Sequence, residues 1–134
     1  MAELSRLVDT MEYDGLISGL TPKAKVTGGT IRKLGTAATL VRGTILARSS
    51  GTAGDDKLVV LGTTAATNET LTADCILADD IEVGTSADVN AAVYDMGCFD
   101  PDKLTVASGY TITAADKDAL RQRGIYLAGK SDAN

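Results

Sequence analysis

The sequence contains no histidine and no tryptophan, and its 134 residues include only one phenylalanine and four tyrosines. Without histidine, the chain lacks the commonest general base, the usual transition-metal ligand and every catalytic triad that depends on imidazole. Its two cysteines, Cys75 and Cys98, have the spacing of neither a zinc site nor a C-x-x-C redox pair, so we expect two free thiols. These absences argue against an enzyme and predict no metal and no cofactor.

Long apolar runs are also missing. No stretch reaches the roughly 18 apolar residues of a membrane span, and the opening residues lack the apolar core of a secretory signal. We therefore expect no membrane partner and synthesis in the cytoplasm. Because large aromatic side chains are scarce, the core must be built from Val, Ile, Leu and Ala, and self-association would help to stabilise so modest a core.

Adjacent carboxylates remain as candidates for catalysis or calcium binding. They are Asp55 with Asp56, and Asp79 with Asp80. Neither pair has the spacing of a calcium loop, and neighbouring side chains on a strand point to opposite faces. Solvated turns are the simpler interpretation, because turns favour Asp for its local hydrogen bonds. A hydrolase that uses Asp79 and Asp80 is kept as the least favoured alternative.

Charge is segregated along the chain. Residues 23–48 carry six bases and no acid, whereas residues 49–102 carry one base and 11 acids. The basic stretch is a candidate contact for an acidic partner, because unlike charges steer an encounter and fix its orientation. It can equally face the acidic half of its own fold. Since the stretch has no aromatic residue on which a base could stack, we expect no nucleic-acid partner.

Short segments rich in Val, Ile and Thr, separated by glycine clusters, begin at Val26 and predict a mainly β fold. The expected strands are residues 39–48, 57–61, 74–83, 91–99 and 104–107, with a further extended segment at 125–127. In residues 39–48 both alternating faces mix apolar and polar side chains, so the pattern does not assign the buried face.

One short helix is predicted at residues 114–123. Thr113 can cap it, Asp116 completes a box-like pattern, and Gly124 can end it. Ala115, Ala119 and Leu120 would form its small apolar face. The expected fold class is therefore mainly β with one short C-terminal α-helix, an α+β arrangement.

Five motifs occur in an order known from one family. They are residues 13–19 (YDGLISG), 41–46 (VRGTIL), 75–81 (CILADDI), 92–100 (AVYDMGCFD) and 120–127 (LRQRGIYL). Together they resemble the head decoration proteins of lambda-like tailed phages. The resemblance implies homotrimers at local three-fold positions on the outer surface of the expanded capsid, where they bind the major capsid protein and stabilise the shell. An adhesin on the capsid surface that binds host carbohydrate or a receptor is the alternative.

This resemblance and the composition together divide the chain into an N-terminal arm, residues 1–34, and a β-rich decoration domain, residues 35–134. Glycines and Pro22 make the arm costly to order, so we expect it to be partly disordered until it binds the capsid. An arm packed permanently on its own domain is the alternative. The expected capsid contacts are Tyr13, Leu16, Ile17, Lys23, Lys25, Val26, Ile31, Arg32 and Lys33. The residues expected in the core or at a trimer contact are Val93, Tyr94, Phe99, Ile125 and Leu127.

Overall fold

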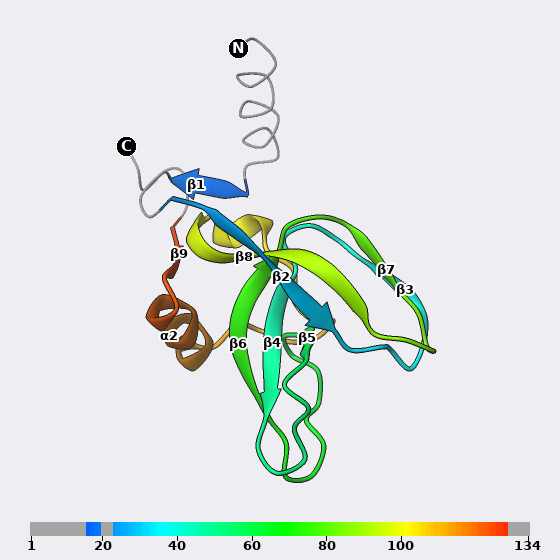
Figure 1. The fold of residues 1–134 in the computed structure, drawn as a ribbon. Helices are drawn as coiled ribbons and strands as arrows, with labels where there is room; N and C mark the ends of the chain where they lie inside the picture. Colours follow the sequence, from blue (N-terminus) through cyan, green and yellow to red (C-terminus); the bar gives the residue numbers. More distant parts are fainter. Residues whose placement is uncertain (1–15, 20–22, 129–134) are drawn as a thin grey trace.

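Strand β8 (Val89–Phe99) is the longest element of the fold, and it pairs with four other strands. The structure, a computed structural model, describes residues 16–19 and 23–128 (Figure 1). The other elements are β1 (Ile17–Gly19), β2 (Lys25–Ile31), β3 (Ala38–Leu40), β4 (Ile45–Ser50), β5 (Leu58–Val60), β6 (Thr70–Leu77), β7 (Ile81–Val83), the 3-10 helix η1 (Pro101–Lys103), α2 (Ala114–Gln122) and β9 (Ile125–Leu127). A mainly β fold with one short helix near the C-terminus is confirmed.

Five strands close into a small barrel. Strand β8 pairs with β2, β2 with β5, β5 with β4, β4 with β6, and β6 again with β8. All of these pairings are antiparallel except β2 with β5, which is parallel through Ile31 and Leu58. Closure leaves no free edge in this part of the sheet. Strands β3 and β7 form a separate two-stranded ribbon beside the barrel (Figure 1).

Both faces of the barrel wall carry apolar clusters. One cluster takes residues from all five barrel strands and fills the interior: Ile31, Leu46, Leu58, Cys75, Leu77 and Val93, with Val83 of the ribbon. Their chain neighbours Ile45, Val59, Ile76 and Tyr94 point outward into a second cluster. That outer cluster is completed by Leu16, Phe99, Leu120 and Ile125, which come from the ends of the chain and from α2. Because β4 is buried on both faces, alternation along it could not identify a single buried face.

The helix follows its prediction closely. Thr113 accepts a hydrogen bond from the backbone N–H of Asp116, whose side chain accepts from the N–H of Thr113, so the capping box is complete. The helix ends at Gln122, and Leu120 is its buried residue. Ala115 is exposed, which corrects its assignment to the apolar face. No helix among the described residues is both long and apolar enough to cross a membrane.

Three strand predictions are corrected by the structure. Residues 39–48 divide into the end of β3 and the start of β4, because the chain turns at Gly43 with a φ of +94°. Residues 74–83 divide into β6 and β7 at an exposed turn that contains Asp79 and Asp80. Residues 104–107 form no strand, and only an isolated bridge joins Thr105 to Thr44. In each case a turn or a nonlocal partner overrides local β propensity.

Candidate functional site

The segment predicted as a separate arm is part of the barrel from β2 onward. All seven residues of β2 pair with β8, and Ile31 is completely buried in the interior cluster. A Cβ on Gly29 would lie 2.7 Å from Cδ1 of Leu58, so this glycine permits close packing rather than disorder. In the structure, residues 25–31 of the predicted arm are therefore a strand of the barrel. Tyr13 lies outside the described residues.

The two ends of the described chain meet at the end of β8. Ile17 of β1 pairs with Phe99, which in turn pairs with Leu127 of β9. The backbone N–H of Asp100 donates to the carbonyl of Leu16 at 2.8 Å, and that of Ala128 donates to the carbonyl of Phe99 at 2.9 Å. We call the surface formed by β1, β9 and residues 96–99 of β8 the terminal edge.

The terminal edge has open backbone positions. Within the described residues, β1 and β9 each have β8 as their only strand partner. Among the residues that the structure describes, their outer edges have no strand partner, and such edges can accept a strand from another chain. Edge strands as short as these limit how much of a partner can pair in this way.

Apolar side chains are exposed at and beside this edge. Val26 of β2 is 52% exposed, Met96 of β8 37% and Tyr126 of β9 43%. Of the apolar residues predicted to contact a capsid, Leu16 and Ile31 instead belong to the protein's own core, and Ile17 is half-buried. Met96 and Tyr126 were not predicted as contact residues from the sequence. Alternation in the segment 125–127 contained the signal for Tyr126, whose neighbours Ile125 and Leu127 point to the core.

Three exposed lysines have no acidic partner among the described residues. Lys23, Lys25 and Lys33 are exposed, and none of them has an ion pair among the described residues. Lys25 pairs through its backbone with Met96, which places it next to the terminal edge. Lys23 precedes it by two residues. These cations can steer an acidic surface toward this part of the molecule.

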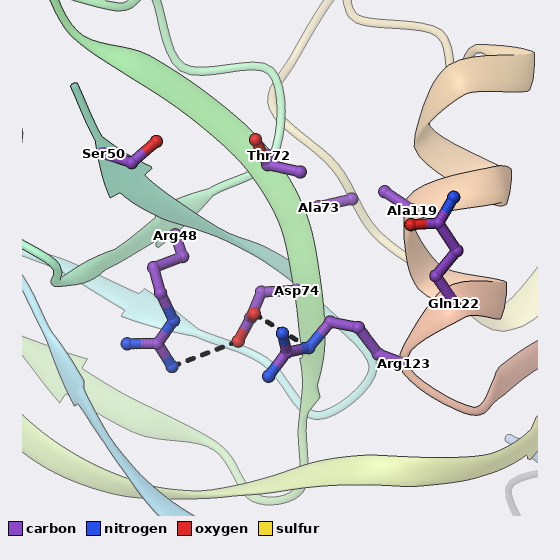
Figure 2. A pocket seen from close by; sticks show the side chains of 8 residues that line it. All are labelled: Arg48, Ser50, Thr72, Ala73, Asp74, Ala119, Gln122 and Arg123. Atoms are coloured by element: carbon purple, nitrogen blue, oxygen red, sulfur yellow. Dashed lines mark hydrogen bonds and ion pairs between the residues drawn. The ribbon is translucent and has the colours of Figure 1, made fainter.

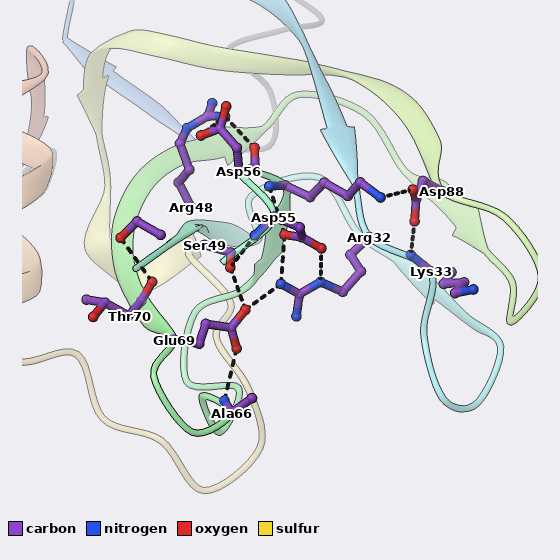
Figure 3. A network of polar contacts seen from close by, with 12 residues as sticks. Arg32, Lys33, Arg48, Ser49, Asp55, Asp56, Ala66, Glu69, Thr70 and Asp88 are labelled. Atoms are coloured by element: carbon purple, nitrogen blue, oxygen red, sulfur yellow. Dashed lines mark hydrogen bonds and ion pairs between the residues drawn. The ribbon is translucent and has the colours of Figure 1, made fainter. Parts of the chain in front are cut away.

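Arg32, by contrast, is paired with acidic side chains of its own chain (Figure 3). Its guanidinium donates to both carboxylate oxygens of Asp55, at 2.9 and 2.8 Å, and to Oε2 of Glu69 at 2.5 Å. Glu69 also accepts from the backbone N–H of Ala66 and from the hydroxyl of Ser49. The basic stretch therefore faces the acidic half of its own fold at Arg32, as the second interpretation of the charge pattern expected.

These contacts lower the pKa of both carboxyl groups. The Arg32 guanidinium is the main cause for Asp55, whose pKa falls to about 2. For Glu69, the N–H of Ala66 contributes most, followed by Ser49 and Arg32, and the pKa is again about 2. The network links β2 to the loops that follow β4 and β5, so Arg32 has a structural role in this protein.

The residues expected in the core or at a trimer contact lie in the core. Val93, Tyr94, Phe99 and Ile125 are each at most 2% exposed, and Leu127 is partly buried against them. The rings of Tyr94 and Phe99 have centroids 5.2 Å apart and are tilted by 51°. Arg42 lies over the Tyr94 ring at 5.3 Å and donates to its hydroxyl. Because these side chains are buried within a single chain, they stabilise the folded monomer.

The adjacent carboxylates have no shared site. Asp79 and Asp80 are exposed in the β6–β7 turn, where Oδ1 of Asp80 accepts from the backbone N–H of Arg42 at 2.7 Å. In the described ranges, no three His, Cys, Asp or Glu side chains come together as metal ligands. Cys75 and Cys98 are unpaired, and burial raises the pKa of the Cys75 thiol far above its ordinary value.

Comparison with known protein families identifies the chain. Residues 9–126 match the family model described as bacteriophage lambda head decoration protein D. The match defines a structural protein of the phage virion that is associated with the capsid. More specifically, the chain belongs to the lambda head decoration protein D family, which confirms the resemblance seen in its five motifs. A search of curated proteins found no match.

Proposed function

We propose that this protein binds the outer surface of the expanded phage capsid as homotrimers at local three-fold positions and stabilises the shell. The observation that carries the proposal is the family match, which includes the whole barrel and β1. In this proposal the major capsid protein is the partner, the protein is not an enzyme, and it is made in the host cytoplasm. A protein that binds only the expanded lattice stabilises that lattice by mass action.

The terminal edge is the best-supported contact with the capsid. It combines open strand edges with exposed apolar side chains, Met96 and Tyr126, and with nearby unpaired charge at Lys23 and Lys25. Backbone pairing would supply affinity, the apolar side chains would be desolvated on contact, and the lysines would steer the encounter. Leu16 and β1, the first described residues of the chain, form part of this edge.

Decoration of purified expanded shells tests the proposal. Electron microscopy should show density at local three-fold positions, and decorated shells should withstand more heat than bare shells. Binding should weaken as salt is raised, since exposed charges are screened. Density confined to other positions, or shells that melt at the same temperature with and without the protein, would contradict it. Binding to host cells or glycans without binding to shells would instead favour the adhesin alternative.

Two variants locate the contact. Deletion of residues 1–15 leaves every described strand intact, whereas deletion of residues 1–34 would remove β2 and expose the interior cluster. The shorter deletion and a double Lys23→Glu, Lys25→Glu variant should fold normally and decorate poorly. Lys33→Glu, which changes an exposed lysine beyond the opposite end of β2, is the charge control and should decorate normally. Undiminished decoration by both test variants would rule out this edge.

A further inference from the structure

A hollow of about 350 Å³ lies between the barrel wall and α2 (Figure 2). It is lined by Arg48 and Ser50 of β4, by Thr72, Ala73 and Asp74 of β6, and by Ala119, Gln122 and Arg123 at the end of α2. The pairing of β4 with β6 moves from Leu46–Cys75 to Ala47–Ala73, so Asp74 is the extra residue of a β-bulge. A bulge of this kind redirects the side chain of the extra residue.

Asp74 fixes two arginines beside this hollow. Its carboxylate is only 6% exposed. Oδ2 accepts a hydrogen bond from Nη2 of Arg48 at 3.2 Å, and Oδ1 forms an ion pair with Nε of Arg123 at 2.9 Å. Figure 2 shows the two guanidinium groups reaching Asp74 from opposite sides. One buried carboxylate thus orients two cations that come from different elements, and the three side chains together carry a charge of +1.

Several donors in the hollow remain free. Both terminal nitrogens of Arg123, the hydroxyl of Thr72 and the amide of Gln122 have no hydrogen-bond partner among the described residues. The two terminal nitrogens of a guanidinium form a planar fork that matches two oxygens of one carboxylate or phosphate. Since Nε of Arg123 forms the ion pair with Asp74, its two terminal nitrogens are the ones left to contact a ligand.

Two further features of the hollow disfavour the binding of an anion and lower the affinity that we expect. Asp56 lies 3.7 Å from Nη1 of Arg48, although that carboxylate is 84% exposed. Arg123 also follows the C-terminal end of α2, where the helix dipole is negative. Binding through one guanidinium fork and two neutral donors is therefore expected to be weak, with a dissociation constant on the order of 1 mM.

We propose that this hollow is an oxyanion-binding site that takes one phosphate or carboxylate group on the free fork of Arg123, with Thr72 and Gln122 as further donors. The site is independent of the proposed contact with the capsid. Two sources would present the same chemistry, free inorganic phosphate and the carboxylate of a sugar acid. Their shapes differ beyond the oxyanion, so they can be distinguished by titration.

Nuclear magnetic resonance of the isolated full chain tests the site without any capsid. Sodium phosphate and glucuronate are titrated against sodium chloride at equal ionic strength, with glucose as the neutral control for glucuronate. We expect saturable shifts of the Arg123 side-chain signal and of the backbone amides of Thr72 and Gln122 with at least one anion. Arg123→Gln should weaken that binding about tenfold or more, which corresponds to the loss of one charge-assisted contact.

Arg121→Gln is the matched control, since Arg121 is on the same helix, is 66% exposed and is not in the hollow. Thr72→Val is a second test variant that keeps β propensity and leaves both arginines in place. A saturable response to phosphate alone supports a free ion, and one to glucuronate alone supports a sugar acid. Shifts no larger than those with chloride and glucose, or equal loss of binding in Arg121→Gln, would overturn the proposal.

Discussion

Truncation of Phe99 to alanine tests whether the meeting point of the two chain ends holds the monomer together. The Phe99 side chain is completely buried, its ring contacts that of Tyr94, and its backbone pairs with both Ile17 and Leu127. Removal of a buried phenylalanine side chain costs about 3–5 kcal/mol, because apolar contacts are lost and a cavity remains. A small domain is stabilised in total by only about 5–15 kcal/mol, so the variant should be close to its unfolding threshold.

Urea unfolding followed by circular dichroism measures this loss. With a slope of about 2 kcal/mol/M, a loss of about 4 kcal/mol lowers the midpoint by roughly 2 M at an unchanged slope. Tyr126→Ala is the matched control, because Tyr126 is an aromatic residue of β9 that is 43% exposed. Its free energy of unfolding should fall by less than about 1 kcal/mol. A Phe99→Ala midpoint equal to that of the unaltered protein, or equal losses in both variants, would refute the assignment of Phe99 to the core.

Three further predictions concern the polar network, a turn and the helix cap. The folded pKa values of Asp55 and Glu69, both about 2, lie below their ordinary values of 3.8 and 4.5. The stability that these two carboxylates contribute is therefore complete above about pH 5 and is lost as the pH falls toward 2. Arg32→Gln should reduce this loss of stability at low pH, as measured by urea unfolding between pH 7 and 2.5. Gly43→Ala should cost about 2 kcal/mol in urea unfolding, because φ is +94° and the new Cβ would lie 2.9 Å from a carbonyl oxygen. Thr113→Ala should cost about 1 kcal/mol and lower the melting temperature in calorimetry, because it removes half of the capping box.

Each of these predictions has a control within the chain. Arg121→Gln removes an exposed arginine and should leave the acid dependence unchanged. Gly84→Ala adds a Cβ that meets nothing within 4 Å and should be nearly neutral. Thr111→Ala removes an exposed threonine outside the cap. Identical acid profiles with and without Arg32, or test and control variants of equal stability, would contradict the corresponding argument.

The sequence predicted well those features whose causes are local. Thr113, Asp116 and Gly124 lie within 12 residues of one another, and they set the start and end of α2 as expected. The fold class followed from Val-, Ile- and Thr-rich segments for the same reason, since each such segment favours extended structure by itself.

Features that depend on distant partners could not be predicted in this way. Strand β2 has two central glycines and looks like a flexible arm until β8, more than 55 residues away, is placed beside it. Arg32 looked available to an acidic partner because Asp55 and Glu69 are 23 and 37 residues away along the chain. The sequence around Asp74 does not indicate a β-bulge, so the hollow between β6 and α2 was not predicted.

The junction of β1, β8 and β9 has a consequence for the protein while it is being synthesised. Phe99 emerges from the ribosome well before Leu127, its strand partner in β9. At about 5–20 residues per second, residues 100–127 take roughly 1 to 6 s to make. The outer apolar cluster lacks Leu120 for most of that interval and Ile125 for nearly all of it. The nascent chain therefore presents an uncovered apolar face and an unpaired β8 edge to its surroundings, and completion of the fold must wait until translation has passed residue 127.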